Sequence, residues 1–302
     1  MSMSDPVASA DPASSGTAAS LVVDLLRGAA ARLAGAGVAD PSVDAELLLG
    51  HVLGASRGEV QAAAIRGAEV SPVEAAAFGA LVVRRAAREP LQHLTGLAPF
   101  RHLELAVGPG VFVPRPETEI VAQFAIDALL SAASPEPIGV DLCAGSGAIA
   151  LALATEVPHA QVHAVELSPQ AHAWAARNTA GRQNLHLVLG DLSDELIELD
   201  GTVDVVISNP PYVPDDAIPR DPEVRLHDPA LALYGGADGL DVVRAISRRA
   251  WALLRPGGAL VLEHAEVQGA AVRALLDADG WHATATHRDL TQRDRATTAI
   301  RP

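Results

Sequence analysis

The chain has little of what would place it outside a reducing compartment or in a membrane. Its 302 residues contain one cysteine, Cys143, so no intramolecular disulfide can form. No apolar run reaches the roughly 18–20 residues that a bilayer-spanning helix needs. Residues 1–18 are rich in Ser, Ala, Asp and Pro without a basic segment, which predicts a disordered tail and not a signal peptide. We therefore expect a soluble, cytoplasmic protein with no membrane partner.

Positive charge and aromatic residues are also scarce. The chain has 22 Lys and Arg against 37 Asp and Glu, a formal net charge of −15. Binding to a nucleic-acid backbone needs clustered basic side chains, so this balance argues against a stable nucleic-acid partner, although it is compatible with a local basic groove. Aromatic residues make up 3%, but apolar residues reach 49%, which is ample for a buried core of Ala and Val. The length fits two domains or one large domain with an appendage.

Two catalytic signatures are missing as well. The histidines form no pair with a carboxylate or cysteine at metal-ligand spacing, so we expect no metal. No Ser-His-Asp signature supports hydrolysis. Cys143 lies in a glycine loop, and we interpret it as a small packing residue and not a nucleophile.

The first part of the chain has a helical pattern throughout. Asp40-Pro41 predicts an N-cap followed by proline at the first helical position, and Ser71-Pro72-Val73-Glu74 has the form of a capping box before a helix to about Arg88. No strand-like run interrupts it. We predict a small all-α domain over residues 19–90.

Residues 91–113 change character. Glycine and proline punctuate two short runs, Phe100 to Leu105 and Val111 to Val113, which suggest a β-hairpin linker. A proline-rich stretch, residues 113–119, then ends the strand, and a helix from Glu117 to about Leu130 opens the remaining domain, residues 114–302.

From Ile138 onward strands and helices alternate. The expected strands are Ile138–Cys143, Gln161–Leu167, Leu185–Leu189, Val203–Ser208 and Ala259–His264. The expected helices start near Gly147, Pro169, Asp238 and Glu266. This alternation predicts an α/β fold with a mainly parallel sheet and helices on both faces. The last runs, Ala283–Thr286 and Ala296–Ile300, predict an antiparallel hairpin at the sheet edge.

A glycine loop, Asp141 to Gly147 (D-L-C-A-G-S-G), stands where the first strand turns into a helix. Glycines there let the backbone approach a ligand, and the helix N-terminus adds a positive dipole end. The spacing of Gly145, Gly147 and Ala150 also fits the loose dinucleotide fingerprint. The loop therefore predicts a nucleotide site without choosing the nucleotide.

Acidic residues follow the next two strands. Glu166 is placed for ribose hydroxyls and Asp191 for an adenine amino group, and each taken singly can equally be an ordinary solvated charge. Together with Asp141 they end three successive strands around a position with few cations. Such a site repels a pyrophosphate but not a cationic sulfonium, which favours S-adenosylmethionine over NAD.

Asn209-Pro210-Pro211-Tyr212 closes the apolar strand at Ser208. Proline lacks an N–H and pushes the preceding residue to an extended shape, so the carbonyls of Asn209 and Pro210 stay out of helices and ladders. With the Asn209 side-chain oxygen they can hold both hydrogens of a planar –NH2 group, and Tyr212 offers a flat face beside it. The tetrapeptide alone can also be only a turn. Beside the upstream loop it indicates chemistry on an amino or amide nitrogen.

Several motifs now occur together in a recognisable order. They are P-L-Q-H-L-T-G (90–96), V-P-R-P-E-T-E (113–119), the glycine loop, N-P-P-Y (209–212), L-Y-G-G-A-D-G-L (233–240) and L-E-H (262–264). From residue 20 onward the chain resembles the bacterial HemK-type protein N5-glutamine methyltransferases, which modify peptide chain release factors. N-P-P-Y alone is shared with DNA adenine methyltransferases, whereas the combination is far more specific.

The resemblance implies a seven-stranded, Rossmann-like sheet of the class I S-adenosylmethionine-dependent methyltransferases, joined by the hairpin to a helical domain that docks the release factor. The substrate would be the glutamine of the Gly-Gly-Gln loop, in translation termination. Cofactor binding is expected at Asp141, Cys143, Ala144, Gly145, Ser146, Gly147, Glu166, Asp191, Leu192, Asn209, Arg115 and Glu117. Catalysis is expected from Asn209, Pro210 and Tyr212, with Pro211 completing the substrate site.

Two positions depart from the family pattern. Leu192 stands where many relatives carry an aromatic residue, which weakens adenine stacking, and His93 stands where Tyr is frequent. Arg115 and Glu117 have two open roles: closure over the methionine end of the cofactor, or a structural joint between domains.

Three rival functions share part of this pattern. A DNA or RNA adenine methyltransferase would need a basic cleft and usually a target-recognition domain. A ribosomal-protein glutamine methyltransferase keeps the chemistry and changes the protein substrate. A non-catalytic nucleotide-binding adaptor would not need intact acceptor and cofactor motifs.

Overall fold

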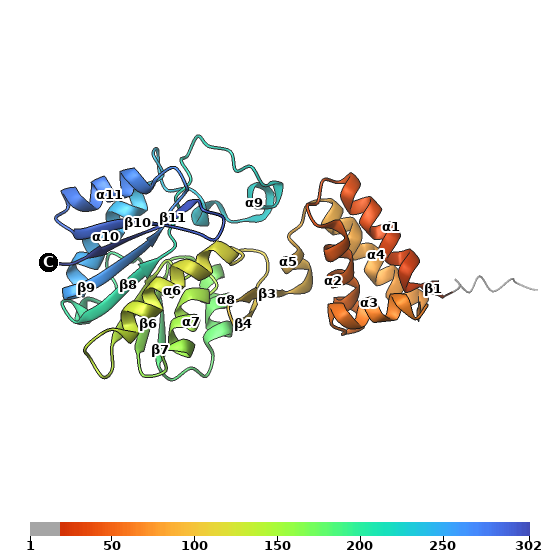
Figure 1. The fold of residues 1–302 in the computed structure, drawn as a ribbon, viewed down its shortest axis with the longest axis horizontal. Helices are drawn as coiled ribbons and strands as arrows, with labels where there is room; N and C mark the ends of the chain where they lie inside the picture. Colours follow the sequence, from red (N-terminus) through yellow and green to blue (C-terminus); the bar gives the residue numbers. More distant parts are fainter. Residues whose placement is uncertain (1–18) are drawn as a thin grey trace, which may run out of the picture. The chain divides into compact units, whose positions relative to one another are not determined.

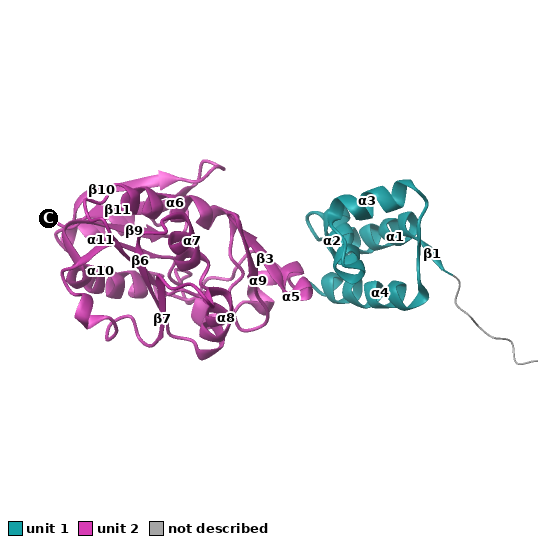
Figure 2. Ribbon diagram, turned by 90° about the horizontal axis from the view of Figure 1, so that it is seen from below, with its two compact units in different colours: residues 1–88 teal, residues 89–302 magenta. Residues whose placement is uncertain are grey.

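The computed structural model describes residues 19–302, which divide into two compact units at Arg88 and Glu89 (Figures 1 and 2). The predicted tail, residues 1–18, lies outside the described residues. Among residues 19–302 no helix is both long and apolar enough to cross a membrane.

The first unit is built from four helices. They are α1 (Val22–Gly35), α2 (Pro41–Leu53), α3 (Arg57–Ile65) and α4 (Pro72–Ala86). The predicted capping box is confirmed, since the Ser71 hydroxyl accepts from the Glu74 N–H at 3.3 Å. Asp40 occupies the predicted N-cap position of α2, but its side chain makes no capping hydrogen bond.

The expectation of a strand-free helical segment is wrong in one detail. A two-residue antiparallel pair joins β1 (Ser20–Leu21) to β2 (Glu69–Val70). Strands this short carry no alternating pattern, so the sequence gives no sign of them.

The second unit opens with α5 (Leu91–Thr95) and a hairpin of β3 (Leu97–Phe100) and β4 (Leu103–Ala106). The predicted pairing of Phe100–Leu105 with Val111–Val113 is wrong. The turn falls inside the first run because Arg101 adopts a left-handed φ of 54°, held by ion pairing with Glu156.

A seven-stranded sheet follows, in the order β10-β11-β9-β8-β5-β6-β7 (Figure 1). Its parallel strands are β5 (Ile138–Leu142), β6 (Gln161–Glu166), β7 (Leu185–Leu189), β8 (Val203–Ser208) and β9 (Leu254–Glu263). Antiparallel β10 (His282–Arg288) and β11 (Asp294–Ile300) complete one edge. The predicted strands and the edge hairpin are confirmed, although β9 begins at Leu254 and not at the predicted Ala259.

Helices cover both faces of this sheet. One apolar core lies under α6 (Pro116–Leu130), α7 (Ala148–Glu156) and α8 (Pro169–Thr179), and a second lies under α10 (Asp241–Leu253) and α11 (Gly269–Ala278) (Figure 1). Helix α9 (Pro222–His227) belongs to the long β8–α10 connection. The α/β prediction is confirmed, although α10 and α11 each begin three residues later than expected.

The strand order changes direction at β5, which places a crevice at the carboxyl ends of β5 and β8. Leu142 pairs with Ser208, and Ser208 pairs with Leu262 on β9. The residues that follow these strand ends, Cys143 and Asn209, therefore lie side by side. Ligands of open α/β sheets bind at this kind of switch point.

Candidate active site

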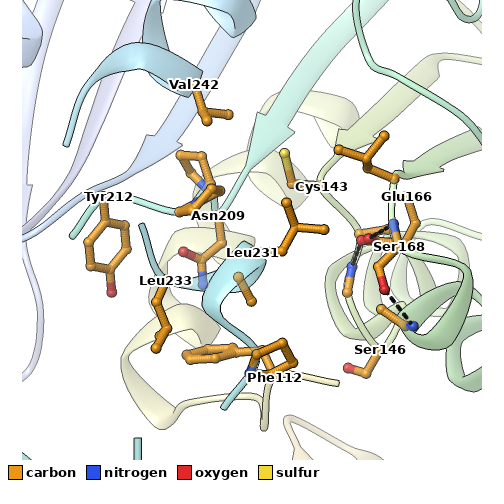
Figure 3. A pocket seen from close by; sticks show the side chains of 18 of the residues that line it. Phe112, Cys143, Ser146, Glu166, Ser168, Asn209, Tyr212, Leu231, Leu233 and Val242 are labelled. Atoms are coloured by element: carbon orange, nitrogen blue, oxygen red, sulfur yellow. Dashed lines mark hydrogen bonds between the residues drawn. The ribbon is translucent and has the colours of Figure 1, made fainter. Parts of the chain in front are cut away.

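A cavity of about 710 Å³ opens at the carboxyl ends of β5, β6 and β8 (Figure 3). Of the residues expected to form a site, it is lined by Arg115, Glu117, Cys143, Ala144, Gly145, Ser146, Glu166, Asp191, Leu192, Asn209, Pro210, Pro211 and Tyr212. The glycine loop and the N-P-P-Y segment thus face the same space.

The glycine loop owes its shape to three left-handed residues. Cys143, Gly145 and Gly147 have φ values of 68°, 58° and 79°. A Cβ at Gly145 would meet nothing within 4 Å, so this position borders open space. A Cβ at Gly147 would lie 3.2 Å from the Thr179 side chain of α8. Gly147 therefore serves helix packing, and it does not line the cavity.

Asp141 also lies behind the cavity wall and not in it. Its side chain is fully buried, and Oδ2 accepts from the Ala150 N–H of α7 at 3.1 Å. Burial raises the pKa of Asp141 to about 8. Asp141 and Gly147 thus support the loop from behind the cavity wall, and contact of either residue with a cofactor stays a prediction.

Glu166 connects the ends of two elements. Its Oε2 accepts from the Gly145 N–H and its Oε1 from the Ser168 N–H, each at 2.7 Å. Burial raises the pKa of this carboxyl, and the two backbone N–H groups oppose that shift. One carboxylate therefore fixes the glycine loop against the end of β6 while bordering the cavity (Figure 3).

Asp191 and Leu192 follow β7 on the same side of the cavity. Asp191 Oδ1 accepts from the Ser193 N–H at 2.8 Å, which fixes the turn. Leu192 packs against the core under α10 and presents an aliphatic surface to the cavity.

Asn209 is oriented by a residue whose role the sequence did not suggest. Its Nδ2 donates to the hydroxyl of Thr118 at 3.4 Å, while Oδ1 has no hydrogen-bond partner within residues 19–302. The Pro210 carbonyl likewise accepts no hydrogen bond from the described chain, whereas the Tyr212 carbonyl accepts from the Gln268 side chain at 3.0 Å. Two acceptors are thus left available beside the cavity.

Tyr212 forms one end of the cavity (Figure 3). Burial of its hydroxyl raises the pKa of Tyr212, and the nearby Glu263 carboxylate raises it further. The phenol therefore stays neutral and can donate a hydrogen bond.

Arg115 lines the cavity but its charge is engaged. Its guanidinium pairs with Asp228 at 2.8 Å and lies 4.9 Å from the centre of the Phe112 ring. Asp228 belongs to the β8–α10 connection, so this ion pair ties that connection to the segment before α6. Burial raises the pKa of Asp228 to about 6, and Arg115 opposes that shift.

Sequence reasoning missed the wall that the β8–α10 connection supplies. It contributes Asp221, Val224, Pro229, Leu231, Ala232, Leu233 and Tyr234. The motif L-Y-G-G lies within it, but the connection has no periodic pattern that would place it over a cavity.

The cavity is strongly acidic. Among the described residues that line it, the carboxylates are Glu117, Glu166, Asp191, Asp221 and Asp241, and the one basic side chain is the paired Arg115. This excess of carboxylates suits a cationic ligand and disfavours a pyrophosphate. Within residues 19–302 no group of three His, Cys, Asp or Glu side chains is arranged to hold a metal ion.

Comparison with known proteins places the chain in a family. A model of the PrmC N-terminal domain matches residues 24–96, and a model of the methyltransferase small domain matches residues 103–224. A release factor glutamine methyltransferase of Streptomyces coelicolor is 52% identical, covering 89% of this chain and 94% of the relative. One of Bifidobacterium longum is 48% identical, covering 93% and 99%.

A further relative carries a different name. The 4-amino-L-phenylalanine/4-methylamino-L-phenylalanine methyltransferase of Streptomyces pristinaespiralis is 42% identical, covering 94% of this chain and 96% of the relative. The motifs, the sheet and the full-length similarity agree, and the chain belongs to the release factor glutamine methyltransferase family.

Proposed function

We propose that this chain uses S-adenosylmethionine to methylate the side-chain amide nitrogen, N5, of the glutamine in the Gly-Gly-Gln loop of peptide chain release factors. Identity of 48–52% to named relatives over most of the chain supports this assignment. The single observation that carries it in the structure is the pair of unengaged acceptors, Asn209 Oδ1 and the Pro210 carbonyl, in the cavity that the glycine loop also borders.

The residues present fit S-adenosylmethionine. When bound, it supplies a methyl group on a cationic sulfonium, and the acidic lining of the cavity favours that charge. Glu166 and Asp191 retain lone pairs beyond their backbone hydrogen bonds, with which they can accept from ribose hydroxyls and the adenine amino group. Gly145 leaves the room that a ligand at the loop needs.

The N-P-P-Y segment acts on the glutamine. An amide nitrogen is a poor nucleophile because its lone pair is delocalised into the carbonyl. Asn209 Oδ1 and the Pro210 carbonyl accept its two N–H groups, which holds the nitrogen in place and favours pyramidal character. Orientation of this kind is worth roughly 7–11 kcal/mol of barrier. As the new N–C bond forms, the bond between the methyl carbon and sulfur breaks and leaves a neutral thioether. The nitrogen then releases a proton to water or a nearby acceptor, so no dedicated base is needed.

Tyr212 and the β8–α10 connection complete the substrate site. Tyr212 supplies a flat surface beside the amide, and Leu231 and Leu233 face the cavity from the connection (Figure 3). The Arg115–Asp228 ion pair holds this wall in place. Arg115 therefore shapes the cavity through its partner and through Phe112.

We assign docking of the protein substrate to the helical segment, residues 19–90. The substrate is the folded release factor in the cytoplasm, because a bare glutamine peptide offers little surface to recognise. Neither a nucleic acid nor a membrane is expected as a stable partner, given the net charge of −15.

A second candidate is methylation of an aromatic amine. It is favoured by the relative named for 4-amino-L-phenylalanine, and an aryl –NH2 presents the same two hydrogens to the same acceptors. Four acceptors tested in parallel with labelled S-adenosylmethionine separate the possibilities: a release factor, a ribosomal protein, duplex DNA and 4-amino-L-phenylalanine. Label in the release factor alone supports the proposal, and label in any other acceptor alone contradicts it.

A further inference from the structure

A buried polar cluster lies beside the N-P-P-Y segment, and two of its members, Glu263 and Arg295, have no part in the proposed reaction. Its members are Thr118 at the start of α6, Glu263 at the end of β9 and Arg295 on β11. Thr118 is 3% exposed and Glu263 is 1% exposed. A carboxylate this deep in an apolar fold is costly unless it interacts with donors, so its surroundings call for a functional explanation.

The sheet brings Glu263 next to Asn209. Strands β8 and β9 run parallel with Ser208 opposite Leu262, so the next residues, Asn209 and Glu263, stand at the same level. Val261, two residues before Glu263, packs in the core under α6. Alternation along the strand puts the Glu263 side chain on that same face, toward Thr118.

Charges and hydroxyls surround the Glu263 carboxylate from each neighbouring element. Burial raises the pKa of Glu263 to about 7, the hydroxyls of Thr118 and Tyr212 and the Arg295 guanidinium lower it, and Glu117 raises it. Oε2 has no hydrogen-bond partner within residues 19–302. Burial therefore favours the neutral carboxyl, and the surrounding hydroxyls and guanidinium favour the ionised one.

The direction of the hydrogen bonds between Glu263, Thr118 and Asn209 determines how the Asn209 amide is oriented. A side-chain hydrogen bond with Thr118 stabilises the charged form of Glu263, and because an ionised carboxylate only accepts, the hydroxyl is its donor. The oxygen of that hydroxyl then accepts from Asn209 Nδ2, at the observed 3.4 Å. The amide is thereby held with Nδ2 inward and Oδ1 toward the substrate. A protonated carboxyl can instead donate to Thr118, whose hydroxyl is then free to donate to Asn209 Oδ1 and turn the amide.

We propose that Glu263 is a positioning residue, which through Thr118 fixes the Asn209 amide with Oδ1 presented to the substrate nitrogen. The inference rests on the proposed function and names the device that orients its acceptor. Glu263 itself touches no reacting atom.

Three variants test this hydrogen-bonded relay from Glu263 through Thr118 to Asn209. Glu263→Gln keeps the shape and adds a donor, Thr118→Val removes the hydroxyl, and Thr118→Ser keeps it. The matched control is Asp204→Asn, because Asp204 is also a buried carboxylate but lies near the amino end of β8, where it pairs with Arg255. For each we would measure kcat and KM for the release factor, the Kd of S-adenosylhomocysteine, and the pH profile.

We expect Glu263→Gln and Thr118→Val to lose about 100-fold in kcat, the scale for a misplaced reacting group, with Kd unchanged. Thr118→Ser should restore most of the loss seen in Thr118→Val. Wild-type kcat should fall as pH drops below about 7, the pKa to which burial brings Glu263, and Glu263→Gln should abolish that limb. Asp204→Asn should lower thermal stability and keep the wild-type pH profile.

Two results would overturn the relay. The first is a Glu263→Gln enzyme with wild-type kcat and pH dependence. The second is a parallel loss of kcat and cofactor affinity in Glu263→Gln, which indicates general damage. Failure of the wild-type enzyme to label any release factor would overturn the proposed function as well, so the two failures are distinguishable.

Discussion

The Asn209 side chain offers the sharpest single test of the substrate site. In the structure its Nδ2 is held by Thr118 and its Oδ1 is left without a partner, so replacement by alanine removes one acceptor that the proposed reaction needs. Loss of one preorganised hydrogen-bonding group at a reacting centre costs about 10²–10³ in kcat, or roughly 2.7–4 kcal/mol. We expect Asn209→Ala to lose kcat in that range.

Cofactor binding should respond very differently to the same change. The glycine loop is fixed by Glu166 and packed from behind by Gly147, and none of these contacts involves Asn209. The Kd of S-adenosylhomocysteine, measured by calorimetry, should therefore stay close to the wild-type value. Equal losses in kcat and in cofactor affinity would refute the division of roles.

A second variant at this position separates shape from hydrogen bonding. Asn209→Asp keeps the size of the side chain but presents an oxygen to Thr118, whose hydroxyl then donates to it and turns away from Glu263. Because aspartate still presents an oxygen to the substrate and loses only the fixed orientation, we expect this variant to lose kcat, but by less than Asn209→Ala. Wild-type activity in Asn209→Asp would contradict the orientation argument.

The remaining predictions concern the support of the cavity. Burial raises the pKa of Asp141 to about 8, so between about pH 4 and pH 8 the native state holds a proton that the unfolded chain has released. The free energy of unfolding should therefore fall as pH rises through that range, by at most about 1.4 kcal/mol per pH unit. Chemical denaturation across that range should show this decrease, and Asp141→Asn should remove the part that Asp141 contributes. An unchanged pH dependence of unfolding in Asp141→Asn would contradict the raised pKa of Asp141. Gly145→Ala and Gly147→Ala both meet a left-handed φ, a cost of about 1–2 kcal/mol, but only the first places a methyl group in open space at the cavity. Gly145→Ala should thus weaken cofactor binding more, and Gly147→Ala should lower the melting temperature more, since its methyl also crowds Thr179; the reverse order would refute the packing argument. Arg115→Ala leaves the Asp228 side chain, which is 0% exposed, without its ion-pair partner, so KM for the release factor should rise as the cavity wall loosens, and an unchanged KM would show that the ion pair is dispensable.

Most of the parallel strands could be predicted from sequence because they are apolar runs with clear ends, whereas the start of β9 is hidden by the run R-P-G-G, residues 255–258. Val203–Ser208 is the clearest case, bounded by Gly201 on one side and by the two prolines after Asn209 on the other. The β3–β4 hairpin could not be predicted in the same way. Its turn depends on the left-handed Arg101, which is held by Glu156, a residue far away in the sequence.

The site, too, could be predicted from sequence only in part. Motif spacing identified the glycine loop, but it does not tell which side of the loop faces the cavity, so it could not show that Asp141 and Gly147 lie behind the cavity wall. Thr118 and Glu263 both lie in stretches that carried the family resemblance, yet no role could be given to them. Their position beside Asn209 follows from the adjacency of β8 and β9 and from α6 crossing that face.

The central claim is methyl transfer to one glutamine of a release factor, and one measurement tests it directly. The purified chain is incubated with labelled S-adenosylmethionine and an intact release factor, beside a factor whose Gly-Gly-Gln glutamine is changed to alanine, and the labelled residue is identified by mass spectrometry. Label on the glutamine side chain of the intact factor, and none in the alanine variant, is the predicted result. Equal label in both factors would contradict the claim, and so would an absence of label in either.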